Sequence, residues 1–324
     1  MAGKDNYMQT TILISGAGQL GSRYLQGLSE CSIPLTIYIQ DCYQESLQKA
    51  EHLWNEVSDN TIHRTSFHLS LNEIPNEIDI TIVATTADVR PHVVSEISQS
   101  INVNYWVLEK VLAQSDTALE LIYESVENCS GAWVNTPRRM MPWHQKIKRH
   151  LYLGSPLTLK VKGGSWGLAC NAIHFIDLLS WWTGEKVESI STDHLSSEWF
   201  ESKRKGYWEV FGTLEICFSG GTIAQLTSDL SDDSNSIFVN DEQFSWDINE
   251  IEGLAKRSDG MEITGKLPYQ SEITAELIEA IISDGKCELP TLEESIALHR
   301  VFLNSMQIHW DKAGMHTSSV VPIT

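Results

Sequence analysis

A glycine-rich turn between an apolar strand and a helix is the feature that most restricts how this chain can fold. Residues 10–15, TTILIS, form a β-branched apolar run, and GAGQLG follows directly at 16–21. Apolar residues then recur at helical spacing at Leu20, Tyr24 and Leu28. A strand that enters a helix through G-x-G-x-x-G opens a doubly wound α/β sheet, so we expect a parallel sheet here.

Each glycine of this turn has its own physical role in binding a dinucleotide. Gly16 permits the tight turn, Gly18 lets the backbone approach a pyrophosphate, and Gly21 lets the helix pack on the strand. Gln19 and Leu20 begin the helix, where free N–H groups bind an anion. These five residues are predicted cofactor contacts, and the alternative is a glycine-rich loop without a ligand.

An acidic residue at the end of the second predicted strand extends this pattern. The strand LTIYIQ at 35–40 ends at Asp41, twenty positions after Gly21. A carboxylate there accepts hydrogen bonds from the adenosine ribose and repels a 2′-phosphate. The sequence therefore favours NAD, and nearby basic residues such as Lys49 leave NADP open as the alternative.

Two further strands are predicted at 78–84 and 104–108, with a helix at about 91–100 between them. Polar residues follow both strands, where strand ends open onto the crevice of a doubly wound sheet. These residues are predicted cofactor contacts: Thr85, Thr86, Glu109 and Lys110. For the two threonines, a plain turn is the alternative.

The second half carries a helix with a polar face. Residues 158–184 run from a strand through a glycine turn into an apolar helix. Asn171, His174 and Asp177 are spaced three apart and therefore lie near one helical face. A neutral imidazole there accepts a hydroxyl proton as hydride leaves carbon. The alternatives are a histidine satisfied by packing and an aspartate that only orients a neighbour.

Residues 135–148, NTPRRMMPWHQKIK, place basic and aromatic groups together. Arg138 and Arg139 are predicted to grip a carboxylate or phosphate of the substrate, and Trp143 to stack on a sugar. Trp166 is a further predicted contact, because the eleven tryptophans suit a carbohydrate pocket. Salt bridges and core packing are the alternatives.

The rest of the chain contains strands followed by helices. Residues 207–248 alternate as strands of an antiparallel sheet. The last stretch predicts two helices, with a capping box from Thr291 to Glu294 at the start of the second. At 324 residues the chain exceeds the size of one core, so we expect domains at 1–125 and 126–324.

Composition excludes several classes of protein. The net charge of −20 disfavours nucleic acid, with SKRKG at 202–206 the one short basic stretch. No apolar run approaches the roughly 18 residues of a membrane span. The start shows no secretory signal, which predicts a cytoplasmic protein. Six cysteines without C-x-x-C spacing predict neither a metal site nor a disulfide framework.

In order, these motifs resemble the Gfo/Idh/MocA family of oxidoreductases, the glucose-fructose oxidoreductase and inositol dehydrogenase group. The matching stretches are GAGQLG, Asp41, VATTADVR at 83–90, LEKVL at 108–112, and the H-x-x-D helix from His174. Cys170 stands where family dehydrogenases usually carry an aspartate. Val111 replaces the proline of E-K-P, and Arg90 stands where a histidine is common.

The resemblance implies an α/β protein: an N-terminal Rossmann domain, then an α/β domain with a large, mostly antiparallel open sheet. That sheet would carry the substrate site and an oligomer interface, which predicts a homodimer or homotetramer. Lys110 matches the lysine that contacts the nicotinamide ribose and the substrate hydroxyl. His174 matches the catalytic histidine, and Asp177 the acid one turn later.

The resulting hypothesis is an NAD(P)-dependent oxidoreductase acting on a secondary alcohol or ketone of a sugar, cyclitol or nucleotide-linked sugar. Lys110, His174, Asn171 and Asp177 are its predicted catalytic group. One alternative is an enzyme that oxidises its sugar transiently, without net redox change. Another is a catalytically inactive protein that senses NAD(H). Net NADH formation with a panel of sugars separates the three.

Overall fold

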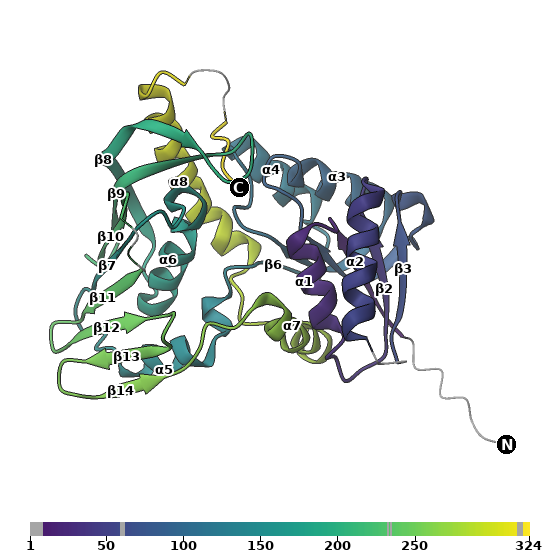
Figure 1. Cartoon of the computed structure of the whole chain (residues 1–324), viewed down its shortest axis with the longest axis horizontal. Helices are drawn as coiled ribbons and strands as arrows, with labels where there is room; N and C mark the ends of the chain where they lie inside the picture. The colour runs from purple at the N-terminus through teal and green to yellow at the C-terminus, as the bar shows by residue number, and fades with distance from the viewer. Residues whose placement is uncertain (1–8, 59–61, 232, 234, 316–319) are drawn as a thin grey trace. The chain divides into compact units, whose positions relative to one another are not determined.

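The computed structural model describes residues 9–58, 62–231, 233, 235–315 and 320–324 (Figure 1). The chain forms two compact units, each assembled from three stretches of sequence. Unit 1 contains residues up to 109, 121–133 and 268–287. Unit 2 contains 110–120, 134–267 and 288–324. The predicted division into domains at 1–125 and 126–324 stays a prediction.

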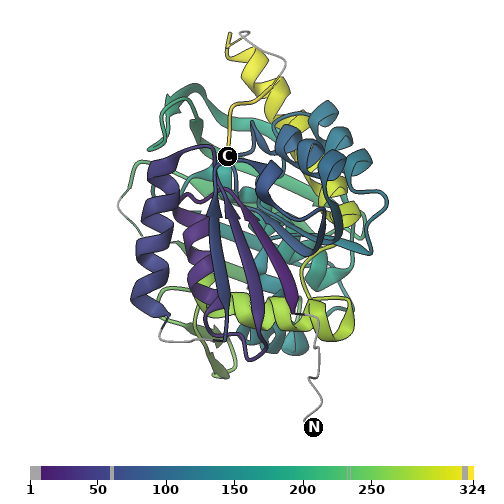
Figure 2. The same cartoon turned by 90° about the vertical axis from the view of Figure 1, so that its right-hand side faces the viewer.

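Unit 1 is built on a six-stranded sheet in the order β3-β2-β1-β4-β5-β6. The β1–β2, β2–β3, β1–β4 and β4–β5 pairs are all parallel, and Figure 2 shows these strands side by side. The strand order reverses between β1 and β4, as in a Rossmann sheet. The strands are β1 Thr10–Ser15, β2 Leu35–Gln40, β3 Arg64–His68, β4 Glu77–Val83, β5 Asn102–Leu108 and β6 Gly131–Val134.

Helices that connect these strands pack on the sheet: α1 Gln19–Leu28, α2 Gln44–Val57 and α3 Arg90–Ser100. The unit also contains the short η1 Leu71–Glu73 and, from late in the chain, α7 Gln270–Asp284, while α4 Asp116–Ser125 begins in unit 2 and ends in unit 1. Helix α1 packs against both α2 and α7. A Cβ added at Gly27 would lie 2.6 Å from Thr274 of α7, so this glycine permits the close contact.

The glycine turn has the predicted strand–turn–helix form. Gly16 has φ +97°, which L side chains rarely adopt, and its N–H donates to the Gln40 carbonyl at 2.8 Å. A Cβ on Gly21 would lie 1.8 Å from the Gly16 carbonyl oxygen. The third glycine is therefore needed for helix α1 to approach strand β1.

Unit 2 contains an eight-stranded sheet in the order β14-β13-β12-β11-β7-β10-β9-β8. The β7–β10 pair is parallel and every other pair is antiparallel. The predicted fold class, a parallel Rossmann sheet plus a large and mostly antiparallel open sheet, is therefore confirmed. The strands are β7 Thr158–Gly163, β8 Val187–Glu201, β9 Trp208–Phe218, β10 Ile223–Ser228, β11 Ser236–Asn240, β12 Ser245–Asn249, β13 Leu254–Arg257 and β14 Glu262–Thr264.

Helices cover one face of this sheet. Helix α6 packs on β9 and β10, and α8 packs on β8 and on α6 (Figure 1). The predicted capping box is present, with the Glu294 N–H donating to Thr291 Oγ1 and the Thr291 N–H to the Glu294 carboxylate. The helices of this unit are η2 Pro137–Met140, α5 Pro142–His150, α6 Leu168–Thr183 and α8 Leu292–Lys312.

The other face of the sheet presents a mixed set of exposed side chains. Ile223 and Phe238 are each 42% exposed, and the charged Lys160 and Lys162 stand beside them on β7. The face therefore presents both apolar and charged side chains. Self-association through it stays a prediction.

Two further expectations concern the environment of the chain. Within the described residues, no helix combines the length and hydropathy required to cross a bilayer. All six cysteines lie in the described part of the chain and are free thiols. The expected cytoplasmic address stays a prediction.

Replacing Gly21 with alanine tests the helix–strand contact. The new methyl group would overlap the Gly16 carbonyl, so we expect the free energy of unfolding to fall by about 3 kcal/mol, as in severe overpacking. Gly18→Ala is the matched control, because its Cβ would meet nothing within 4 Å and its φ of −66° suits alanine. Urea unfolding measures both variants, and equal stabilities would contradict this account of the turn.

Candidate functional site

The start of helix α1 in unit 1 has the features of an anion site. Gly18 is the N-cap and provides no side-chain cap, so the first-turn N–H groups have no capping side chain. A Cβ at Gly18 would have no described atom within 4 Å, which leaves the backbone open to a ligand. Gln19 and Leu20 follow directly in the first turn. This geometry fits a pyrophosphate bound at a helix N-terminus.

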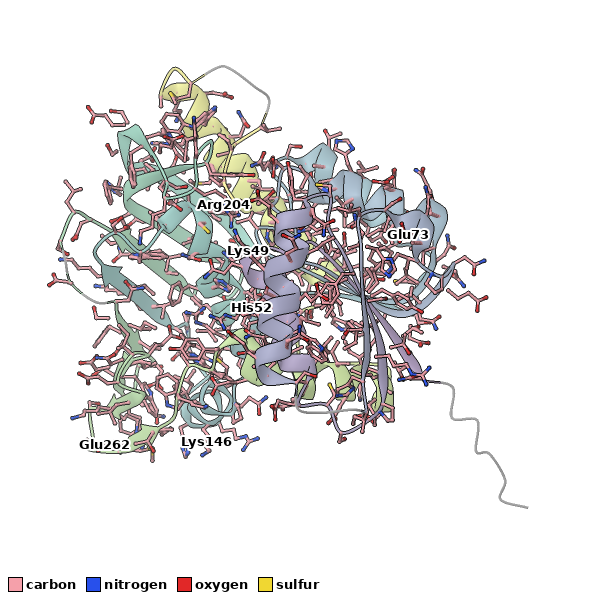
Figure 3. The ribbon with its side chains drawn as sticks, turned by 45° about the vertical axis from the view of Figure 1, so that its right-hand side comes forward. Lys49, His52, Glu73, Lys146, Arg204 and Glu262 are labelled. Atoms are coloured by element: carbon pink, nitrogen blue, oxygen red, sulfur yellow. The ribbon has the colours of Figure 1, made fainter. Side chains whose placement is uncertain are left out.

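Asp41 stands beside this turn, as the sequence predicts. Its Oδ2 accepts the Ala17 N–H at 2.7 Å, and its Oδ1 accepts the Tyr43 N–H at 2.9 Å. A carboxylate offers about four lone-pair sites, so each oxygen retains capacity for a ribose hydroxyl. Lys49, the basic residue considered for a 2′-phosphate, is exposed on α2 (Figure 3).

Thr85, Thr86 and Glu109, which follow β4 and β5, lie in unit 1. Thr85 lies against the turn, since a Cβ on Gly16 would be 3.0 Å from its methyl group. Its carbonyl accepts a hydrogen bond from the buried Arg90. Glu109 accepts the Tyr24 hydroxyl at 2.5 Å, and burial together with the charge of Glu109 raises the pKa of Tyr24 well above its ordinary value. Contacts of Thr85, Thr86 and Glu109 with a cofactor stay predictions.

Lys110, in unit 2, meets the first turn of helix α6. Its Nζ donates to Asn171 Oδ1 at 3.2 Å, to Cys170 Sγ at 3.2 Å and to the Cys170 carbonyl at 3.4 Å. Asn171 in turn donates to the Trp166 carbonyl at 2.8 Å, which fixes its amide. The structure therefore brings together Lys110 and Asn171, which are 61 residues apart in the sequence.

His174 lies one turn further along α6 and is half-buried. Its Nδ1 is buried without a hydrogen-bond partner among the described residues. Desolvation, followed by the charges of Lys110 and Arg138, lowers the pKa of His174 well below its ordinary value. The imidazole is therefore neutral at pH 7 and can accept a proton.

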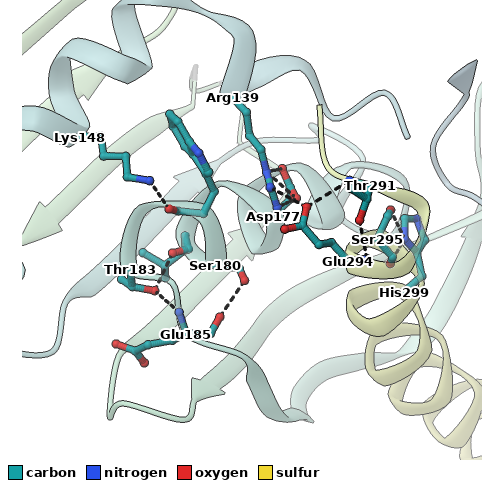
Figure 4. Close-up of polar contacts among 12 residues, drawn as sticks. Arg139, Lys148, Asp177, Ser180, Thr183, Glu185, Thr291, Glu294, Ser295 and His299 are labelled. Carbon is teal, nitrogen blue, oxygen red and sulfur yellow. Dashed lines mark hydrogen bonds and ion pairs between the residues drawn. The ribbon is translucent and has the colours of Figure 1, made fainter. Parts of the chain in front are cut away.

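Asp177 is committed to an ion-pair network (Figure 4). Both of its oxygens accept from Arg139, the shortest contact being 2.6 Å, and Arg139 also pairs with Glu294 at 3.0 Å. Burial raises the pKa of Asp177, and the Arg139 charge opposes that rise. The network joins η2, α6 and α8, so it favours the supporting role for Asp177 over the catalytic one.

Arg138 and Trp143 have partners inside unit 2 as well. Arg138 donates to both oxygens of Glu250 at 2.8 and 2.7 Å and lies 4.5 Å from the centre of the Phe175 ring. Trp143 is buried, and its Nε1 donates to the Ile263 carbonyl at 3.2 Å. The salt-bridge and packing alternatives therefore describe these two side chains. Trp166 is half-buried, with its Nε1 on the Thr227 carbonyl at 2.8 Å.

Sequence reasoning missed two features of unit 2, the Glu209 carboxylate and the segment 320–324. The Glu209 carboxylate, on β9, accepts N–H groups of the turn that holds Lys110. The Cys170 thiol donates to the Thr324 carbonyl at 2.6 Å, and Gln114 Nε2 donates to that of Ile323 at 2.9 Å. A lone glutamate in a strand gives no sign of burial, and the segment 320–324 has no motif, so the sequence offered no signal for either.

The site residues give no indication of a metal. Among the described residues, no group of three or more His, Cys, Asp and Glu side chains is arranged to hold an ion. The side chains gathered at the start of α6 are an amine, an amide, a thiol, an imidazole and the Glu209 carboxylate. They suit proton transfer and the stabilisation of an oxyanion.

Sequence and structure comparisons give different results. The sequence matches no family model, and no curated protein matches it significantly. Among solved structures, UDP-N-acetylglucosamine 3-dehydrogenase GnnA from Acidithiobacillus ferrooxidans has 13% identity and a TM-score of 0.70. That match covers 93% of this chain and 97% of GnnA.

Two further solved structures show the same likeness. An oxidoreductase from Agrobacterium radiobacter, solved with NAD+, L-tartaric acid and magnesium, has 13% identity, a TM-score of 0.72 and coverage of 96% and 97%. Scyllo-inositol dehydrogenase from Lactobacillus casei, solved with NAD(H) and scyllo-inositol, has 13% identity, a TM-score of 0.67 and coverage of 94% and 97%. Over nearly its whole length, this chain has the fold of Gfo/Idh/MocA-type oxidoreductases.

The Arg138–Glu250 pair generates a stability prediction. Glu250→Gln leaves the Arg138 charge buried without its counter-ion, so we expect the free energy of unfolding to fall by about 3–5 kcal/mol. Glu252→Gln, two residues away and exposed, is the control and should leave stability unchanged. Chemical unfolding at pH 7 gives both values, and a loss under about 1 kcal/mol at Glu250 would show that the pair contributes little.

The same pair predicts a dependence on pH. Burial raises the pKa of Glu250, but the Arg138 charge and the hydrogen bond from His144 outweigh it and hold the pKa far below the ordinary range. A carboxylate whose pKa is lowered by folding stabilises the folded state fully above its unfolded-state pKa, which is about 4.3 for glutamate. This stabilisation is lost as the pH falls below that value towards the folded-state pKa. The gap between wild type and Glu250→Gln should therefore narrow below about pH 4. A gap that stays constant down to pH 2 would contradict this assignment.

Proposed function

We propose that this protein is an NAD-dependent oxidoreductase that transfers hydride between the nicotinamide and a secondary alcohol or ketone of a sugar, cyclitol or nucleotide-linked sugar. The observation that carries the proposal is the cluster in unit 2 where Lys110 is hydrogen-bonded to Asn171 one turn before a neutral His174. The fold supports it, because the compared enzymes include sugar and cyclitol dehydrogenases.

The proposed cofactor site is the glycine turn together with Asp41. The open backbone at Gly18 and the uncapped first turn of α1 suit the pyrophosphate, and Asp41 suits the adenosine ribose. Thr85 and Thr86 would flank the dinucleotide. When bound, NAD supplies the hydride acceptor. Two of the compared structures contain NAD or NAD(H), which supports this choice.

His174 is the proposed general base. Its Nδ1 is buried, so the proposal assigns the proton transfer to Nε2. A neutral imidazole has the free lone pair that this proton transfer requires. The low pKa of His174 keeps that lone pair available at neutral and mildly acidic pH.

Lys110 is the proposed electrostatic partner of His174. An ammonium beside the hydroxyl oxygen stabilises the alkoxide character that develops as the proton leaves. Asn171 holds the lysine from one side and would orient the hydroxyl. Asp177, Arg138 and Arg139 act in this proposal by fixing α6 and η2, and Trp143 by holding α5 on β14. Trp166 stays a candidate contact for the sugar.

Binding of the two dinucleotides tests the cofactor site. We expect calorimetry to show tighter binding of NAD than of NADP, because Asp41 repels a 2′-phosphate. Gly18→Ala should weaken NAD binding at least about tenfold, since its methyl group fills the space that the pyrophosphate needs. Its unchanged stability separates this effect from misfolding. Tighter NADP binding to the unmodified protein would refute the role of Asp41.

Turnover tests the catalytic pair, with NADH formation followed across a panel that includes scyllo-inositol and UDP-N-acetylglucosamine. His174→Ala should lower kcat by about 10²–10⁴ and leave NAD affinity nearly unchanged, as expected for a lost general base. Lys110→Met should reduce both. Glu188→Gln, an exposed change on β8, is the control. If His174→Ala kept its turnover within a few-fold, another group would have to be the base.

A further inference from the structure

Glu209 is a buried carboxylate at the start of helix α6. It is 7% exposed and projects from β9. Its Oε2 accepts the Ala169 N–H at 2.8 Å, and its Oε1 accepts the Cys170 N–H at 3.1 Å. First-turn N–H groups have no partner within their helix, and the helix dipole favours an anion there. The carboxylate therefore caps α6 from a neighbouring strand.

The backbone before α6 is shaped to admit this carboxylate. Gly167 adopts a left-handed conformation with φ +76°, and a Cβ there would lie 3.2 Å from Glu209 Oε1. Helix α6 has no side-chain cap of its own from Gly167. Glu209 takes that role.

The turn that Glu209 caps is the turn that holds Lys110. Cys170 donates its N–H to Glu209, while its carbonyl and thiol both accept from Lys110. Asn171, the third acceptor of Lys110, is the next residue. One residue therefore separates the anionic carboxylate from the lysine amine.

We propose that Glu209 is the positioning residue for Lys110: it fixes the turn on which the acceptors of the lysine stand and supplies the negative charge that favours the ammonium form. The catalytic meaning of this assignment rests on the proposed function. For hydride transfer, the consequence is a lysine that keeps its charge while His174 takes the proton from the hydroxyl.

The groups that act on Glu209 come from two segments besides its own strand. Ala169 and Cys170 donate to it from α6, and the charge of Lys110 acts on it from the segment after β5. Thr324 contacts Cys170 in the same turn. On β8 it is paired with the apolar Phe200. Burial raises the pKa of Glu209 to about 7, against the opposing effects of its hydrogen bonds and of the Lys110 charge. Its influence on Lys110 therefore increases between pH 6 and pH 8.

Lysine acylation tests this influence without substrate or cofactor. The rate at which a water-soluble N-hydroxysuccinimide ester modifies Lys110 is measured by peptide mass spectrometry in wild type and in Glu209→Gln. At pH 8 we expect the variant to react about tenfold faster, because the lysine loses the neighbouring negative charge that holds it in place. At pH 6, below the pKa of Glu209, the two rates should come close together. The exposed Lys49 is the internal control in both proteins.

Two outcomes would overturn the proposal. Equal rates at both pH values would show that Glu209 exerts no charge effect on Lys110. A similar acceleration at both pH values would show that the substitution only loosens the turn. The NADH assay is independent of this test, because failed turnover refutes the proposed function and leaves the acylation result unchanged.

If Glu209→Gln does not fold, a titration of the Glu209 carboxyl group provides a second test. The side-chain carboxyl of Glu209, labelled with carbon-13, should titrate near pH 7 in wild type. In Lys110→Met the midpoint should move to higher pH, because the coupling between two charges is reciprocal. An unmoved midpoint would overturn the proposal.

Discussion

The first turn of helix α6 is the constraint on which the arrangement of unit 2 depends. The helix is almost entirely buried, so each of its polar groups needs a partner or carries a desolvation cost of about 1–3 kcal/mol. Glu209 satisfies the N–H groups, Lys110 satisfies Asn171, and Arg139 satisfies Asp177. Those three partners come from three separate segments, so holding the helix also assembles the proposed site.

Periodic stretches of the fold could be read from the sequence, and aperiodic ones could not. Strands β1 and β2 have the bounds that their apolar runs predict. The fifteen-residue β8 escaped prediction because its residues VESISTDHLSSEWFE are largely polar and its register shifts, which removes the alternation of apolar and polar residues. Strand β3, RTSFH, has only partly buried residues and gives an equally weak signal.

The site, like the fold, has residues that local motifs predict and residues whose partners lie far away in the sequence. The glycine turn and Asp41 are local motifs whose geometry follows from backbone sterics, and the structure shows them in contact. Arg138 and Arg139 look the same in the sequence whether they bind a ligand or pair with a carboxylate of the protein. Their partners Glu250 and Asp177 lie 112 and 38 residues away, and only the fold reveals them.

The surroundings of His174 show how an acidic protein could provide for the anionic transition state of the proposed reaction. The chain carries a net charge of −20, yet burial, followed by the positive charges of Lys110 and Arg138, lowers the pKa of His174. Salt screens exposed charges beyond about 8–10 Å, so the acidic surface has little effect at the buried turn. Local donors therefore determine the chemistry there. In the proposed mechanism, His174 is neutral and stands beside the single positive charge of Lys110. A second positive charge appears only when His174 has taken the proton, and this order suits the formation of an alkoxide.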